Sequence, residues 1–282
     1  MCSRPWLTSR AAGAGSVGDM VEFCFATLNH SPLVAQANER VDIVRQIDAT
    51  AEAGFASIEL DVFSLRAWRD NGGTLRDVVR RLDDQGLSCY AMAGLNVYDD
   101  HARSVAEVND LAEICAAFSP QWLLLRLAGS LEPGLEFLRD HLGLFDPAVR
   151  LGFEPSPFTV LRTIQDANAA VDAIGSGAVI VDSWHFFATG ADWPALAALP
   201  DDRLAYVQLD DALDPSGDLQ HDTMHRRALP GEGNLDLARF ASALRERNFE
   251  GVISIEVLSD RWRQESVETF AAAARRSVHP LF

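Results

Sequence analysis

The sequence predicts a closed (β/α)8 barrel, in which eight parallel strands alternate with helices. Two observations predict it: short apolar or β-branched runs recur along the chain, and segments with helical periodicity lie between them. The 282 residues, 48% of them hydrophobic, suffice for one such domain. A doubly wound open sheet is the alternative. That fold normally carries a glycine-rich turn after its first strand, and the segment following the first predicted strand contains no glycine.

Eight segments are predicted as strands because each is short and rich in branched, apolar or aromatic residues. In chain order they span residues 21–28, 57–61, 88–93, 122–127, 149–154, 178–182, 204–209 and 252–257. We expect residues 21–282 to form a single barrel domain. Residues 1–20 are rich in Gly, Ala and Ser without periodicity, which predicts a flexible leader, and Met20 is a candidate natural start.

The segments between the strands carry helical patterns. Apolar side chains recur at helical spacing in residues 104–118, and Ser104 with Glu107 predicts a capping box at the start of that helix. Similar apolar faces appear in residues 237–244 and 267–274. These helices would cover the outside of the barrel.

Composition excludes several classes of function. The net charge of −17, with no basic run, argues against nucleic acid and anionic membranes as partners. No apolar run has the length of a membrane span or the features of a signal peptide, and the four cysteines show no metal-binding or disulfide spacing, so we expect a cytoplasmic protein. All 24 basic residues are arginine, which rules out Schiff-base catalysis by lysine.

Oxygen donors stand at the carboxyl ends of four consecutive predicted strands. They are Glu154, Asp182, Gln208 and Glu256. Each alone could be an ordinary strand-end residue, but the carboxyl ends of barrel strands meet on the face where active sites lie. Glu256 is the most telling, because a carboxylate within "VISIEV" is costly to bury without a partner. Three carboxylates and an amide oxygen suit one hard divalent cation, Mg2+ or Mn2+, better than zinc.

Three further residues near these strand ends are candidates for substrate contacts. His185 follows Asp182 closely, so its imidazole could reach the same site. Trp184 could wall the site, although an aromatic residue beside a strand is more often part of the core. Arg126, near the end of the fourth strand, either binds a substrate carboxylate or hydroxyl from inside or extends to the rim.

The long segment between the last two strands contains two features that we interpret as not binding ligands. His221 and His225 have the i, i+4 spacing of a helical metal site, but no helical pattern surrounds them, which favours a solvated loop. In the loop "LPGEG", Glu232 would repel a phosphate group. We therefore expect an unphosphorylated substrate.

Six segments resemble, in order, the sugar phosphate isomerase/epimerase family, the xylose isomerase-like TIM barrels. They are "AGFASIELD", "GFEPSPF", "VDSWHFFATG", "YVQLDDA", "HRRALPGEGNLDL" and "GVISIEV", and the resemblance runs from about residue 40 onward. It implies one divalent metal ion, Mn2+ or Mg2+, bound by the residues that match Glu154, Asp182, Gln208 and Glu256. It also implies that the two glutamates move protons, while His185 and Arg227 hold substrate oxygens without needing to touch the metal.

Departures from the family pattern bear on the reaction. Many members have His where Gln208 stands, and several dehydratases have Lys at the position of Asp210. Gln208 followed by "HRRALPGEG" is similar to the bacterial 3-dehydroshikimate dehydratase branch. Other dehydratases of that activity carry His at the position of Ser156.

The candidate residues suggest chemistry at the carbon next to a carbonyl. A metal ion would stabilise the enediolate that forms when a proton leaves, with Glu154 and Glu256 as base and acid. We therefore expect an isomerase or epimerase that acts on a small polyhydroxy carbonyl compound. A dehydratase, that is a lyase, of the 3-dehydroshikimate or inosose type is the alternative, and a non-catalytic ligand-binding barrel is the second. Homo-oligomer formation stays open.

Overall fold

The barrel strands of the computed structural model, which describes residues 21–34 and 42–282, match the eight predicted segments. They are β1 (Glu22–Ala26), β2 (Ser57–Asp61), β3 (Ser88–Val97), β4 (Trp122–Leu127), β5 (Arg150–Phe153), β6 (Ala178–Asp182), β7 (Leu204–Leu209) and β10 (Val252–Ile255). All pair in parallel, and β1 closes the barrel between β10 and β2. The predicted (β/α)8 barrel is confirmed. The expected leader, residues 1–20, lies outside the described residues.

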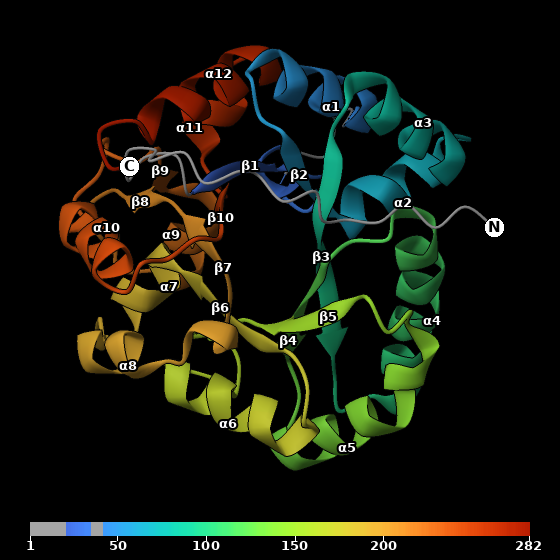
Figure 1. Cartoon of the computed structure of the whole chain (residues 1–282). Coiled ribbons are helices and arrows are strands. Elements are labelled where there is room, and N and C mark those ends of the chain that lie inside the picture. Colours follow the sequence, from blue (N-terminus) through green and yellow to red (C-terminus); the bar gives the residue numbers. More distant parts are fainter. Residues whose placement is uncertain (1–20, 35–41) are drawn as a thin grey trace, which may run out of the picture.

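Helices surround these strands, most of them in an outer ring (Figure 1). They are α1 (Ile43–Glu52), α2 (Val62–Asp70), α3 (Leu75–Gln85), α4 (His101–Phe118), α5 (Leu131–His141), α6 (Ile164–Ile174), α7 (Ser183–Ala188), α8 (Trp193–Ala198), α9 (Leu219–His225), α10 (Leu237–Glu246), α11 (Asp260–Arg263) and α12 (Val267–Ser277). Short 3-10 turns span Thr27–His30, Leu142–Leu144 and Asp201–Arg203. In the described part of the chain, no helix combines the length and apolar character that crossing a bilayer requires.

Two local predictions were wrong. Strand β3 continues past residue 93, because Gly94 adopts a φ of 130° at a bulge in its pairing with β4. Helix α4 begins at His101 rather than at Ser104, because the side chain of Asp100 accepts the N–H of Arg103 and caps it. The Ser104 hydroxyl donates to the carbonyl of Tyr98, so the predicted capping box does not form.

Side chains alternate between the two faces of the barrel wall. In β6, Val179 and Val181 pack in the main core, which includes the surrounding helices. Ile180 belongs to a smaller cluster built from strand residues, together with Tyr206 of β7. Because strand side chains alternate with a period of two, this smaller cluster lies inside the barrel. Residues two positions further along these strands therefore also face inward, at the carboxyl end.

Candidate active site

Asp182 ends β6 and starts α7. Its Oδ1 accepts the N–H of His185 at 2.7 Å, which caps the helix, and its Oδ2 accepts from Arg227 Nη1 at 2.8 Å. Burial alone would raise the pKa of Asp182, but the Arg227 guanidinium holds that pKa below its ordinary value. The carboxylate is therefore an anion with one oxygen committed to the helix and the other facing the barrel mouth.

Arg227 lies among the carboxylates of this centre. It starts β9 (Arg227–Ala228), which forms a two-stranded antiparallel sheet with β8 (Asp211–Ala212). Its Nη1 donates to Asp210 at 2.6 Å and is 3.4 Å from Glu256 Oε2, in addition to the contact with Asp182. Its Nε and Nη2 donate to the carbonyl and hydroxyl of Thr223. One guanidinium nitrogen thus partly neutralises three buried carboxylates.

Glu154 and His185 face each other across the same centre. Glu154 follows β5 directly, and burial raises its pKa to about 7. Its Oε2 is 3.4 Å from Arg126 Nε and its Oε1 is 3.8 Å from His185 Nε2. Burial lowers the pKa of His185 to about 3, so the imidazole is neutral, and its Nδ1 has no hydrogen-bond partner among the described residues.

Gln208 occupies the inward position on β7. Its Nε2 donates to Glu256 Oε1 at 2.9 Å and to Glu59 Oε1 at 3.2 Å. Its Oε1 is buried and has no hydrogen-bond partner in the described chain. Glu256 follows β10 directly, and burial raises its pKa well above the ordinary value. All four strand-end residues predicted from the sequence therefore meet in one connected group.

These residues fit a divalent cation. Donor atoms of Glu154, Asp182 and His185 lie within 4.8 Å of one another, which makes His185 a candidate nitrogen ligand that the sequence analysis had assigned to substrate. A buried acceptor such as Gln208 Oε1 rarely lacks a partner within the protein unless a water molecule or an ion binds it. Buried carboxylates outnumber the two arginines that contact them, so further positive charge would be stabilising.

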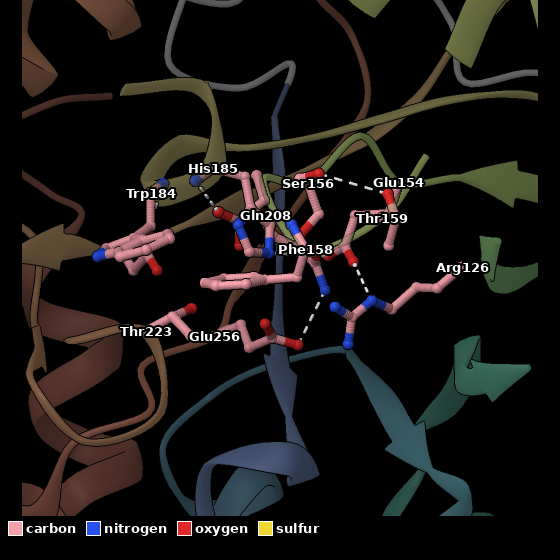
Figure 2. A network of polar contacts seen from close by, with 12 residues as sticks. Arg126, Glu154, Ser156, Phe158, Thr159, Trp184, His185, Gln208, Thr223 and Glu256 are labelled. Carbon is pink, nitrogen blue, oxygen red and sulfur yellow. Dashed lines mark hydrogen bonds and ion pairs between the residues drawn. The ribbon is translucent and has the colours of Figure 1, made fainter. Parts of the chain in front are cut away.

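A cavity that is partly open to solvent lies over this centre. Its polar lining includes Arg126, Glu154, His185, Arg227 and Glu256, and its apolar lining includes rings of Phe63 and Phe158. Figure 2 shows Arg126, Phe158 and Glu256 gathered around the site.

Trp184 lies beside the cavity wall. It is buried, stacks on Phe158 with ring centroids 6.2 Å apart, and packs edge-on against His185. The structure does not place it among the described residues that line the cavity, which fits a supporting position behind the Phe158 ring better than a direct wall.

The segment between β8 and β9 differs from the prediction. His221 and His225 lie on α9, which Asp218 caps, so the predicted solvated loop was wrong. Their rings stack 5.0 Å apart, and His225 pairs with Asp260. Thr223, from the same helix, lines the cavity, so α9 covers one side of the mouth.

The loop "LPGEG" is tied down by Asp211. The Asp211 carboxylate accepts the N–H groups of Gly231 and Gly233, each at 3.0 Å, and that of Leu235 at 2.9 Å. A Cβ added at Gly233 would lie 2.4 Å from Asp211 Oδ1, so glycine is needed for this approach. Because a carboxylate of the chain occupies these amides, they are not offered to a substrate phosphate.

The geometry agrees with a comparison against family models. The model described as "Xylose isomerase-like TIM barrel" matches residues 47–277. The chain belongs to this family. Among curated relatives, a 3-dehydroshikimate dehydratase of Pseudomonas putida is 31% identical over 83% of this chain, and an inosose isomerase of Bacillus velezensis is 30% identical over 47% of it. The chain spans 39% and 48% of the lengths of these two relatives.

Solved structures of xylose isomerase-like barrels superpose along most of the chain. The IolI protein with a bound zinc atom has a TM-score of 0.76 at 18% identity, covering 92% of this chain and 97% of that one. D-allulose 3-epimerase from Methylomonas sp. in complex with D-allulose has a TM-score of 0.70 at 16% identity, covering 93% and 98%. At these identities the structures show the shared barrel fold.

Sequence reasoning missed two site residues, Glu59 and Asp210. Glu59 stands between Ile58 and Leu60 in a fully buried strand, the same signal that singled out Glu256, and burial raises its pKa to about 7. Asp210 accepts the Ser183 hydroxyl at 2.5 Å and the N–H of Trp184 at 2.9 Å. It thereby connects Arg227 to the turn that carries His185.

Proposed function

We propose that this chain is a divalent-metal-dependent enzyme that removes the proton next to the carbonyl group of a small, unphosphorylated polyhydroxy compound. One observation carries the proposal: two buried glutamates, Glu154 and Glu256, line the same cavity beside a centre that fits a cation. Glutamates of this kind are suited to transferring protons between the two faces of a bound substrate.

Glu154, Asp182, Gln208 and Glu256 would hold the metal ion, and His185 beside them would contact the substrate. When bound, the ion supplies Lewis acidity that stabilises negative charge on a carbonyl oxygen. The oxygen-rich set suits Mn2+ or Mg2+, while a His185 contact would suit zinc, the ion named for the IolI structure.

The protein side chains then supply positioning and proton transfer. Glu154 would accept the proton, and Glu256 would donate one on the other side. The neutral His185 can donate a hydrogen bond to the oxygen on which charge develops. The ring of Phe158 lines the cavity and would present an apolar face to the substrate.

Dehydration of a carboxylated hydroxy ketone of the 3-dehydroshikimate class is the reaction we favour. The relative that matches the larger share of the chain is a dehydratase with that substrate in its name. Arg126 lines the cavity, and its planar guanidinium suits a substrate carboxylate. Loss of water from 3-dehydroshikimate gives a dihydroxybenzoate, with the α-proton and a ring hydroxyl leaving.

Isomerisation or epimerisation of an inosose or ketose is the second candidate. It is supported by the inosose isomerase relative and by the placement of two glutamates around one cavity, which permits return of the proton to a different position.

The test is to load the purified chain with Mn2+, Mg2+ or Zn2+ and incubate it in D2O with 3-dehydroshikimate, an inosose and a ketose. Ultraviolet absorbance detects the aromatic product of dehydration, and NMR detects deuterium next to the carbonyl. Aromatic product supports the dehydratase, and deuterium incorporation with a rearranged sugar supports the isomerase. Binding of these compounds without either signal would instead support a non-catalytic barrel. Metal analysis of each sample identifies the ion that supports turnover.

A further inference from the structure

Glu59 contacts Gln208, a candidate metal ligand, from a strand three places away around the barrel. Its strand, β2, is separated from β7 by β1 and β10 in the order around the barrel. Its side chain therefore reaches across the interior, where Oε1 accepts the Tyr206 hydroxyl at 2.8 Å and Gln208 Nε2 at 3.2 Å. Glu59 is 1% exposed, so solvent does not replace either contact.

The two carboxylates around Gln208 decide which way its amide points. Nε2 lies between Glu59 Oε1 and Glu256 Oε1 and donates a hydrogen bond to each. An amide turned the other way would place its oxygen against Glu59 Oε1, which already accepts the Tyr206 hydroxyl, and two acceptor oxygens in contact repel each other. The buried Oε1 is thus left as the acceptor without a partner in the described chain, available to a cation.

Only one of these two anchors is independent of the metal. Glu256 is itself a candidate ligand, so its contact with Gln208 changes when it binds a cation. Glu59 is held by Tyr206 and, in the described chain, makes no hydrogen bond or ion pair with Asp182, Glu154 or Arg227, so it can keep the amide in place in both states. Partners of this kind orient metal ligands and tune their affinity.

We propose that Glu59 is a positioning residue of the metal centre, which holds the amide of Gln208 so that its Oε1 is directed to the cation. This inference rests on the proposed function, because it presumes that the centre binds a metal ion. It also explains why glutamine can serve here: a carboxylate opposite β7 fixes an amide just as it would fix an imidazole ligand.

The test is to titrate the metal-free full chain with Mn2+ and to measure the binding affinity by calorimetry or equilibrium dialysis. Glu59→Leu removes the acceptor. Glu59→Asp keeps the carboxylate, but its side chain is one methylene shorter, so the carboxylate lies farther from the Gln208 amide. Both should weaken Mn2+ binding by about 10- to 100-fold. Glu59→Gln offers an amide oxygen in the same place and should retain most of the affinity. In Gln208→Ala protein, the further change Glu59→Leu should have no additional effect.

A matched control comes from Asp61, a buried carboxylate two residues along the same strand. It accepts hydrogen bonds from Thr27, Ser31 and the N–H of Ser64, and from none of the candidate ligands. Asp61→Asn should lower the unfolding midpoint and leave Mn2+ affinity unchanged.

The outcomes separate the two ideas. If wild-type protein binds Mn2+ and the Glu59→Asp and Glu59→Leu variants bind it equally well, the positioning role is wrong and the metal centre stands. The role is also rejected if Glu59→Leu lowers Mn2+ affinity equally in the wild-type and Gln208→Ala proteins, because the effect then does not depend on Gln208. If the wild-type chain binds no Mn2+, Mg2+ or Zn2+, the metal centre fails, and this inference fails with it.

Discussion

Arg227 donates to Asp182 across 2.8 Å in the buried mouth of the barrel. The same nitrogen contacts Asp210 and approaches Glu256, so a positive charge already stands among residues that are expected to bind a metal. Removing this cation leaves buried carboxylates without a counterion, whereas a metal ion would restore one.

We therefore expect Arg227→Ala to destabilise the metal-free protein by about 3–5 kcal/mol, since one partner of a buried ion pair is lost. Saturating Mn2+ should recover most of the loss, and metal affinity should not fall, because no ligand is removed. Urea unfolding with and without Mn2+ measures both effects. Arg227→Lys, which keeps the charge, is the matched control. Equal stability of the metal-free variant and the wild type would contradict the neutralising role, while loss of metal would make Arg227 essential to the centre.

The two glutamates should be needed for turnover. Glu154→Gln or Glu256→Gln should lower kcat by about 100-fold or more, because a proton carrier and a metal ligand are altered together. Steady-state assays at saturating metal, with metal content measured in parallel, check this. Glu136→Gln, at an exposed position on α5, is the control. Near-normal turnover in either active-site variant would reject the role of that glutamate.

His185 should act mainly on the rate. We expect His185→Ala to cost about 3 kcal/mol of transition-state stabilisation, because a donor to the developing oxyanion is lost. The kcat should fall while metal content stays the same. If the variant instead loses its metal, His185 is a ligand, and the assignment to substrate is wrong.

Arg126 should decide whether a carboxylated substrate binds well. Removing a hydrogen bond to a charged group costs about 1.5–3 kcal/mol, so Arg126→Gln should raise KM for 3-dehydroshikimate by roughly 10- to 100-fold. For an uncharged inosose the KM should change much less. The ratio of the two KM values is the measurement. A similar rise for both substrates would point to a general effect of the Arg126 contact with Glu154.

His30 should make the fold sensitive to acid. Burial, with the nearby charges of Arg263 and Arg45, lowers its pKa to about 4, and its ring packs against Phe270. Because the folded pKa lies below that of the unfolded chain, protonation favours unfolding. This contribution to stability is complete above pH ~6.5 and is lost as the pH falls toward about 4. Unfolding free energies measured across this range should fall less steeply in His30→Asn.

Carboxylates also titrate in the lower half of this range, so the His30→Asn protein must be compared with His221→Asn, which changes an exposed imidazole. The His221 variant should follow the wild-type profile. Parallel profiles for wild type and His30→Asn would show that His30 does not contribute.

The barrel could be predicted because the sequence of each strand alone identifies it as a strand. Branched apolar runs such as the one before Asp182 mark the strands, and their regular alternation with helices fixes the fold class. Helix α9 could not be predicted, because this short polar helix has no apolar periodicity and depends on its Asp218 cap. The extension of β3 depends on Gly94, whose role appears only when the neighbouring strand is in place.

The site was predicted in part for a similar reason. The inward positions at strand ends follow from strand alternation alone, so Glu154, Asp182, Gln208 and Glu256 could be grouped. Contacts that cross the barrel, such as Glu59 to Gln208, join residues far apart in the sequence and have no local pattern. Whether Arg227 faces substrate or carboxylates depends on the path of β9, which sequence spacing does not determine.

Asp182 both caps α7 and accepts a hydrogen bond from Arg227, and this pair of roles limits which residues can replace it. Glutamate would extend too far to cap α7, histidine could not accept the amide at the helix start in the same way, and asparagine would keep the cap but remove the charge beside Arg227. A saturation library at this codon should therefore contain few tolerated alternatives, and selection for activity and selection for solubility alone should enrich different ones. A substitution at Asp182 therefore changes the start of α7, the charge beside Arg227, or both at the same time.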